Sequence, residues 1–234
     1  MPFIAHPDQT FGGRTYSQNG EDLLILNIFK ALEIKNPSYI DVGAHHPENI
    51  SNTKLLYDLG SRGVNIDANP NLQALFDERR PFDKNIMGVG VGGSQEGTFD
   101  YHMLDDYSGR NTFSQDEVVS NRDKYGYKYP KSISIRVRPL DFYIRQYFNG
   151  IWPAFLSLDA EGLDYDIIKG SSFVSHSGPL VVCVESRPGA SLEMVRLMKR
   201  EKDYFPLTRM GDNLIFIRSG ILHQIWGLGD DDII

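Results

Sequence analysis

Two short apolar segments of the chain each carry an acidic residue near their end. The segment Tyr39–Val42 contains Asp41 and is followed by Gly43, and the segment Gly63–Asp67 finishes on its acid. If both segments are parallel strands, their carboxyl ends meet at one edge of a sheet. A glycine there lets a ligand approach the backbone, and the second carboxylate can accept hydrogen bonds from a ribose diol. The pattern predicts a site for a cofactor that contains adenosine.

The glycines after the first segment narrow the class of cofactor. A nicotinamide site needs three glycines in the pattern G-x-G-x-x-G, which hold a pyrophosphate at a helix N-terminus. Here Gly43 is followed by Ala-His-His-Pro-Glu, and the next glycine is Gly60. A phosphate-binding P-loop pattern is also missing from the sequence. S-adenosylmethionine has ribose and adenine but no phosphate, so it fits this pattern best.

A second group of acids follows two later apolar segments, which end at Asp159 and Glu185. As neighbouring strands they would bring both carboxylates together, with Glu161 and Asp164 on the loop and helix that follow. Crowded carboxylates need a cation, a shared proton or a basic partner. In one interpretation Asp159, Asp164 and Glu185 bind Mg²⁺ or Mn²⁺, which would lower the pKa of an acceptor hydroxyl. In the other, Asp164 caps a helix and Glu185 pairs with Arg187, while Asp159 and Glu161 remain candidate catalytic groups.

Two histidines, His45 and His46, stand directly after the first glycine. A histidine at that position can act as a general base near neutral pH, and His46 is the candidate for this role. His45 is a candidate contact for the acceptor. The alternative is that either ring hydrogen-bonds to backbone and holds the loop.

The apolar residues that surround these groups predict strands that alternate with helices. Strands are expected at about 38–42, 62–67, 84–91, 154–159 and 180–185, and a final hairpin at 204–208 and 214–218. Helices are expected at about 21–35, 52–59, 70–76, 139–148, 165–169 and 194–200. This alternation predicts an α/β fold: a doubly wound, seven-stranded, Rossmann-like sheet whose last strand is an antiparallel hairpin strand.

The alternation is interrupted between about residues 92 and 138. Two strands are expected there, at 98–104 and 132–138, and the polar stretch between them has no clear period. We interpret this part as a β/loop insertion that covers the active site and shapes an acceptor pocket. Its candidate acceptor contacts are His102, Tyr107 and Asn111. The alternative is a solvated strand face with a flexible loop.

Length and composition are those of one globular domain. The chain has 234 residues, 41% hydrophobic and 24% charged, and a net charge of −7, which disfavours nucleic acid as a partner. Its single cysteine, Cys183, lies in an apolar run and is expected to be buried. No stretch is long and apolar enough to be an integral membrane segment, and the expected location is the cytoplasm. We expect an arm or lid at 1–20, the main domain at 21–218 and a tail at 219–234.

Five short motifs follow one another in the sequence: Ser17–Asp22, Tyr39–Pro47, Ser51–Thr53, Asn65–Pro70 and Leu158–Gly162. With these motifs in this order, the chain resembles, over roughly residues 16–218, the FkbM family of S-adenosylmethionine-dependent methyltransferases. One departure is an aspartate at position 67, where a glutamate is more usual. The cofactor residues that the resemblance implies are Glu21, Asp41, Gly43, Asn52, Asp67, Ala68, Asn85 and Val89. For Glu21 the alternative role is a helix-start charge, and for Asn52 it is a helix cap.

The resemblance also implies an activity, transfer of a methyl group to a sugar hydroxyl. The expected enzyme is an O-methyltransferase of polysaccharide or glycosylated natural-product biosynthesis, with a saccharide or glycoconjugate acceptor. The alternatives are methylation of RNA or protein, and a non-catalytic cofactor-binding partner in a glycan pathway. A homo-oligomer is compatible with the sequence, which does not fix the oligomeric state.

Overall fold

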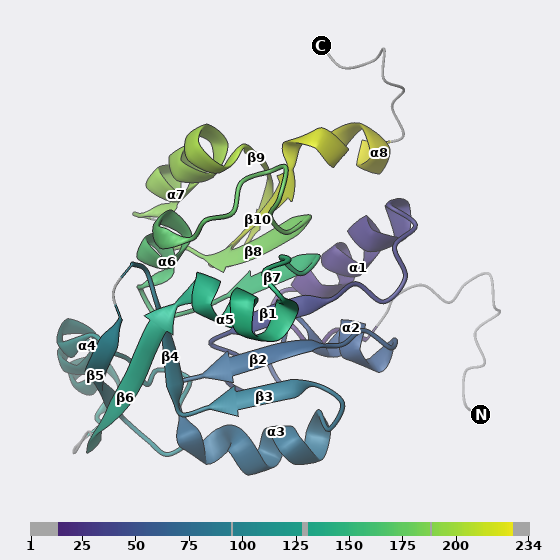
Figure 1. The fold of residues 1–234 in the computed structure, drawn as a ribbon. Coiled ribbons are helices and arrows are strands. Elements are labelled where there is room, and N and C mark those ends of the chain that lie inside the picture. The colour runs from purple at the N-terminus through teal and green to yellow at the C-terminus, as the bar shows by residue number, and fades with distance from the viewer. Residues whose placement is uncertain (1–13, 95, 128–130, 188, 227–234) are drawn as a thin grey trace, which may run out of the picture.

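The computed structural model describes residues 14–94, 96–127, 131–187 and 189–226 of the chain. Its centre is a seven-stranded sheet (Figure 1), made of β1 (Tyr39–Val42), β2 (Gly63–Asp67), β3 (Lys84–Met87), β7 (Phe155–Leu158), β8 (Val181–Glu185), β9 (Tyr204–Met210) and β10 (Asn213–Arg218). The strand order is β3-β2-β1-β7-β8-β10-β9. The first five strands of this order are parallel, whereas β10 is antiparallel to both of its neighbours. The predicted seven-stranded, mostly parallel sheet with a terminal hairpin is confirmed.

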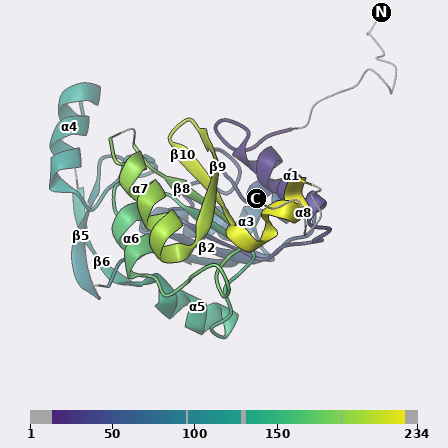
Figure 2. The ribbon, with the colours of Figure 1, turned by 90° about the horizontal axis from the view of Figure 1, so that it is seen from above.

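Helices cover both faces of this sheet (Figure 2), as a doubly wound fold requires. They are α1 (Glu21–Ala31), α2 (Lys54–Asp58), η2 (Pro70–Leu72), α3 (Gln73–Arg79), α5 (Leu140–Phe148), α6 (Asp164–Gly170), α7 (Ser191–Leu197), the π-helical turn η3 (Met198–Lys202), η4 (Ser219–Ile221) and α8 (Leu222–Trp226). Residues of α5, α6 and α7 pack with Ile40 and Val42 in one core cluster. Residues of α1 and α2 pack with Tyr39, Phe155 and Cys183 in the other. Cys183 is buried, as predicted.

The region interpreted as an insertion forms, together with β4 (Val89–Gly92), a second, three-stranded sheet beside the first. This sheet consists of β4, β5 (Gly97–Met103) and β6 (Lys131–Pro139), with α4 (Gln115–Tyr125) between the last two strands. The strand predicted at 84–91 divides at Gly88, whose φ of +79° turns the chain from the main sheet into the second. The sequence did not predict α4. This helix is mostly exposed (Figure 1), so its residues carry no apolar period for a pattern to reveal.

The structure continues past the expected end of the main domain at residue 218. Residues 219–226 form η4 and α8, and Leu222 and Ile225 of α8 pack into the same cluster as α1. Residues 1–13 of the expected arm and 227–234 of the expected tail, with the three aspartates from Asp230, lie outside the described residues. None of the helices in the described part of the chain could cross a membrane, because none is both long and apolar enough.

The main chain is packed most tightly where β1 leaves the sheet. Gly43 has a φ of +73°, and a Cβ atom at this residue would lie 1.7 Å from the carbonyl oxygen of Asp159. The amide of Gly43 donates to the carbonyl of Ile66 (2.9 Å), and that of Asp159 donates to the carbonyl of Val42 (2.9 Å). Gly43 was predicted to let a ligand approach the backbone. In the structure it is needed because the loop after β7 approaches the backbone at this point.

We expect Gly43→Ala to lower the free energy of unfolding by at least about 3 kcal/mol. The substitution combines an unfavourable positive φ with an overlap that the backbone of Asp159 cannot relieve by a side-chain rotation. Urea denaturation measures the change. Gly220→Ala is the matched control, because a Cβ there meets open space and the residue lies in the helical turn η4. An unfolding curve for Gly43→Ala that superimposes on the wild-type curve would contradict the explanation.

Candidate active site

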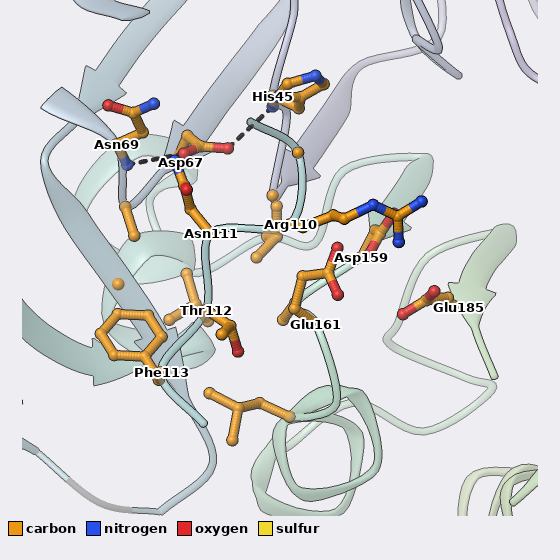
Figure 3. Close-up of a pocket in the computed structure, with 18 of the residues that line it drawn as sticks. His45, Asp67, Asn69, Arg110, Asn111, Thr112, Phe113, Asp159, Glu161 and Glu185 are labelled. Atoms are coloured by element: carbon orange, nitrogen blue, oxygen red, sulfur yellow. Dashed lines mark hydrogen bonds between the residues drawn. The ribbon is translucent and has the colours of Figure 1, made fainter. Parts of the chain in front are cut away.

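A pocket of about 440 Å³ opens at the carboxyl edge of the main sheet, between that sheet and the insertion. Figure 3 shows Asp67 and Asn69 on one side of it and Asp159, Glu161 and Glu185 on the other. The predicted site residues that line it are Gly43, His45, Asp67, Ala68, Val89, Asn111, Asp159, Glu161 and Glu185. The predicted site residues that lie elsewhere are Glu21, Asp41, His46, Asn52, Asn85, His102, Tyr107 and Asp164.

Asp67 is fixed at the end of β2 by two backbone amides. One carboxylate oxygen accepts from the amide of His45 (2.9 Å) and the other from that of Asn69 (2.8 Å), as the dashed lines in Figure 3 show. Burial raises the pKa of Asp67 above its usual range, and the two amide donors oppose this effect. A carboxylate oxygen has two lone pairs, so each oxygen keeps one for a ligand hydroxyl.

Asp41 and Asn52 lie below the pocket, on the face of the sheet that α1 and α2 cover. The carboxylate of Asp41 accepts from the hydroxyl of Thr53 (2.7 Å), and burial raises its pKa. The amide of Asn52 donates to the hydroxyl of Ser157 on β7 (3.2 Å). Both side chains tie the loop after β1 to the sheet. Their direct contact with a cofactor stays a prediction.

Glu21 is buried at the start of α1 and holds a residue of the pocket wall. Its carboxylate accepts from Asn213 (2.9 Å) and from the backbone and side chain of Asn19 (2.8 and 3.0 Å). Burial acts to raise the pKa of Glu21, but these donors lower it below its ordinary value. Asn213 lines the pocket, so Glu21 supports the site from behind.

The two histidines take different positions. The Nδ1 atom of His46 accepts from the amides of Glu48 (3.0 Å) and Asn49 (2.9 Å), an arrangement that matches the alternative role of holding the loop. His45 has a φ of +49° and lines the pocket, with its ring beside Gly109. Burial lowers the pKa of both rings. His45, not His46, therefore presents an imidazole to the pocket.

A fully buried guanidinium holds the loop that carries these histidines. Arg80 donates to the carbonyl of Pro47 (2.8 Å), to Ser51 (2.9 Å) and to the hydroxyl of Tyr39 (3.2 Å), and it pairs with Asp83 (3.4 Å). A buried arginine needs such partners, because an unpaired buried charge is strongly destabilising. Sequence reasoning missed this residue, since a basic residue at the end of a helix has an ordinary explanation in the helix dipole.

The acids on the other side of the pocket lie close together and have a basic partner. Asp159 and Glu185 are near enough for a hydrogen bond between their carboxyl groups when one of the two is protonated. Arg187 forms ion pairs with Glu161 (3.5 Å) and with Glu117 of α4. Glu161 also has a φ of +48°, an uncommon conformation for a residue other than glycine and one often found at functional sites.

The pKa values of these acids are raised toward neutrality. Burial first, and then the charges of neighbouring carboxylates, raise the pKa of Asp159 and of Glu161 to about 7. Burial likewise raises the pKa of Asp164 to about 7 and that of Glu185 to about 8. Asp159 remains open to water in the pocket, so solvent screening reduces the energetic weight of these interactions.

The arrangement does not support the predicted metal site. Asp164 uses its two oxygens to accept from the amides of Ala160 (2.9 Å) and Gly162 (3.2 Å), which matches the predicted capping alternative. Within the described ranges, no group of three or more His, Cys, Asp or Glu side chains could hold a metal ion. The ion pair of Arg187 with Glu161, and protonation of carboxyl groups that their raised pKa values favour, relieve the repulsion instead. Arg187 pairs with Glu161 and Glu117 and not, as the alternative expected, with Glu185.

Asn85 and two predicted residues of the insertion, His102 and Asn111, have local side-chain partners, whereas Tyr107 is exposed. Asn111 lines the pocket, but its side chain accepts from the amide of Leu104 (2.8 Å) and donates to the carbonyl of Asp105 (2.9 Å). His102 is bonded to Ser132 on β6 (2.8 Å), and Tyr107 is 62% exposed outside the pocket. Asn85 donates to Asp77 (3.2 Å) and to the carbonyl of Arg80 (3.0 Å). Sequence reasoning did not single out Arg110 and Phe113, which line the pocket.

We expect the melting temperature to fall between about pH 5 and pH 8, and Glu185→Gln to reduce this fall. The pKa values of the four acids of the pocket region are 3.8 to 4.5 in the unfolded chain and about 7 to 8 in the folded protein. Because the folded pKa is raised, the native state holds more protons in this window, and its stability is lost as the pH rises through the folded values. Glutamine imitates the protonated Glu185.

The comparison of variants isolates this effect. The melting temperatures of wild type and Glu185→Gln should differ little near pH 5. Near pH 8 the variant should have the higher melting temperature. Glu193→Gln, on the exposed side of α7, is the control. Because the pKa values of His45 and His46 are lowered, these residues decrease the stability of the native state as the pH falls below about 6.5. This contribution is the same in wild type and variants, so it cancels when they are compared. Parallel curves for Glu185→Gln and wild type would show that Glu185 is not protonated in the native state.

Comparison with known protein families agrees with this geometry. The model of the family described as Methyltransferase FkbM domain matches residues 41–206, a range that runs from β1 into β9 and contains most of the pocket. Comparisons with curated proteins and with solved structures gave no match. A match over more than half of the chain identifies the family, and the chain belongs to the FkbM methyltransferases.

Proposed function

We propose that this protein is an S-adenosylmethionine-dependent O-methyltransferase that acts on a sugar hydroxyl. The observation that carries the proposal is the carboxylate of Asp67, held by two backbone amides at the pocket wall with lone pairs left for a ribose diol. The volume of about 440 Å³ lies in the range of small-molecule cofactor sites. Membership of the family supports methyl transfer as the reaction.

The residues present fit the adenosine part of this cofactor. Asp67 would hold the ribose, and Ala68 and Val89 on neighbouring strand ends would border the base. When bound, the cofactor supplies an electrophilic methyl group on a sulfonium. Asn213, which Glu21 holds in place, and Gln18 line the same pocket and offer amides to the amino-acid part.

Asp159 and Glu161 are the proposed acceptors of the proton that the sugar hydroxyl loses. Both line the pocket, and their pKa values of about 7 suit a general base that works near neutral pH. Arg187 orients Glu161, and Glu185 orients Asp159. The chain thus contributes a positioned base, which is the main chemical requirement of O-methylation beyond orientation.

The lining of the pocket favours a polyhydroxyl acceptor. Around the two proposed bases lie Glu185, Asp212 and Arg110, and all of these groups donate or accept hydrogen bonds. The excess of carboxyl groups disfavours a polyanion such as RNA. A saccharide offers many hydroxyls to such a surface, which supports a saccharide or glycoconjugate acceptor. The proposal requires no metal ion.

The cofactor is tested by binding of S-adenosylhomocysteine. We expect this ligand at about 100 times its Kd to stabilise the wild type by about 2.7 kcal/mol, whereas NAD leaves the melting temperature unchanged. Asp67→Ala should weaken binding by about 10- to 100-fold, because it removes hydrogen bonds to a charged group. Isothermal titration calorimetry measures the affinity of wild type and of Asp67→Ala for S-adenosylhomocysteine.

Two further variants separate recognition from folding of the loop. Asp67→Glu keeps the carboxylate and should restore most of the affinity. Asp100→Asn, on the exposed part of β5, removes a charge outside the pocket and should bind as the wild type does. Binding of S-adenosylhomocysteine that is equally tight in Asp67→Ala and wild type would end the assignment of Asp67 to the ribose.

The reaction is tested by methyl transfer to a panel of neutral oligosaccharides and nucleotide-linked sugars, with products detected by mass spectrometry. Asp159→Asn should lower the rate of transfer by at least about 100-fold, the contribution of a general base, and leave the affinity for S-adenosylhomocysteine within about twofold. Asp116→Asn, exposed on α4, is the control. Transfer by the wild type to RNA or protein but to no saccharide would contradict the proposed acceptor class.

A further inference from the structure

One tyrosine of the insertion differs from the other buried tyrosines of the described residues. The other three are Tyr39, Tyr143 and Tyr204. Their hydroxyls donate to the carboxylate of Asp83, to the carbonyl of Gly90 (3.0 Å) and to that of Pro179 (2.6 Å). Tyr101 is only 6% exposed, yet its hydroxyl has no hydrogen-bond partner in the described part of the chain. The hydroxyl is not one of the fully buried polar atoms that lack a partner, so it reaches solvent, and its lack of a partner within the protein calls for an explanation.

The position of Tyr101 supplies that explanation, because the residue lines the candidate active site. Burial, followed by the charges of Asp67 and Glu161, raises the pKa of its phenol, so these two acids are its charged neighbours. They belong to the ribose side and the methyl-transfer side of the proposed site. Tyr101 therefore belongs to the part of the pocket wall near both acids, and its accessible hydroxyl can donate a hydrogen bond to a ligand there.

The ring of Tyr101 forms part of an apolar wall. It lies 4.9 Å from the ring of Phe113, centroid to centroid, at an interplanar angle of 50°. Ala68, which follows the ribose acid, packs against the same cluster of insertion residues. Phe113 in turn lies against the backbone of β4, since a Cβ on Gly90 would be 2.9 Å from its ring. The apolar wall thus runs from the insertion to β4, whose first residue, Val89, borders the proposed position of the adenine ring.

We propose that the insertion completes the adenosine site, with the hydroxyl of Tyr101 donating to the nucleoside and the rings of Tyr101 and Phe113 covering the base. This inference rests on the proposed use of S-adenosylmethionine and assigns to the insertion a role in cofactor binding, in addition to the expected role of shaping the acceptor pocket. The backbone of the main sheet supplies one side of the nucleoside site and the second sheet supplies the other.

The inference is tested by the affinities of two probes, S-adenosylhomocysteine and 5′-methylthioadenosine, for purified full-length variants. Tyr101→Phe removes one hydrogen bond and should weaken both probes by roughly two- to tenfold. Phe113→Leu keeps an apolar side chain but loses the ring and should weaken both as well. Tyr107→Phe, in the same insertion but 62% exposed and outside the pocket, should leave both affinities unchanged.

The outcomes separate this inference from the proposed function. If the wild type binds neither probe, the proposed cofactor is wrong. If the wild type binds both and Tyr101→Phe binds them equally well, with the same melting temperature as the wild type without ligand, the role of Tyr101 is overturned. Weaker binding of S-adenosylhomocysteine alone would place the hydroxyl at the amino-acid part and would also overturn the adenosine assignment.

Discussion

The site depends on a close contact between two backbone segments, the turn at Gly43 and the carbonyl of Asp159. A side chain at position 43 would overlap this carbonyl, so β1 and β7 can end side by side only with a glycine at this point. The contact brings the wall that carries Asp67, the proposed ribose side, within reach of the acids proposed for methyl transfer. It also fixes Asp159 without any metal ion or ligand, since the amide of Asp159 is bonded to Val42.

Around this contact the molecule balances crowded acids with few cations. Asp159 and Glu185 lie near enough to share a proton, Arg187 joins Glu161 to α4, and Asp164 accepts from two backbone amides. Each solution is local, and each lowers the repulsion that like charges would otherwise cause. As a result, the pKa values of these acids lie near 7 to 8. A carboxyl group with such a pKa can both accept and release a proton at physiological pH.

Sequence reasoning predicted those residues of the candidate site that stand at strand ends. It did not predict side chains whose position depends on contacts between distant parts of the chain. Asp67 and Asp159 were predictable because each closes an apolar run. The alternation of β1 turns Asp41 toward the face that α1 and α2 cover, so its neighbour in sequence, Val42, lines the pocket instead. The pairing of Glu21 with Asn213 joins residues 192 positions apart, and no local pattern could reveal it.

The network of Arg80 also has a consequence for the order in which the protein can assemble. Its partners all belong to residues 39–83, a continuous stretch that contains β1, α2, β2 and α3. A nascent chain therefore contains every partner of Arg80, and Asp67 with its two amide donors, before β7 and β8 are synthesised. The acids Asp159 and Glu185 come later in the chain, and until β7 is made the edge of β1 that pairs with it has no partner. Until that happens, this edge is open to any other strand in the cell.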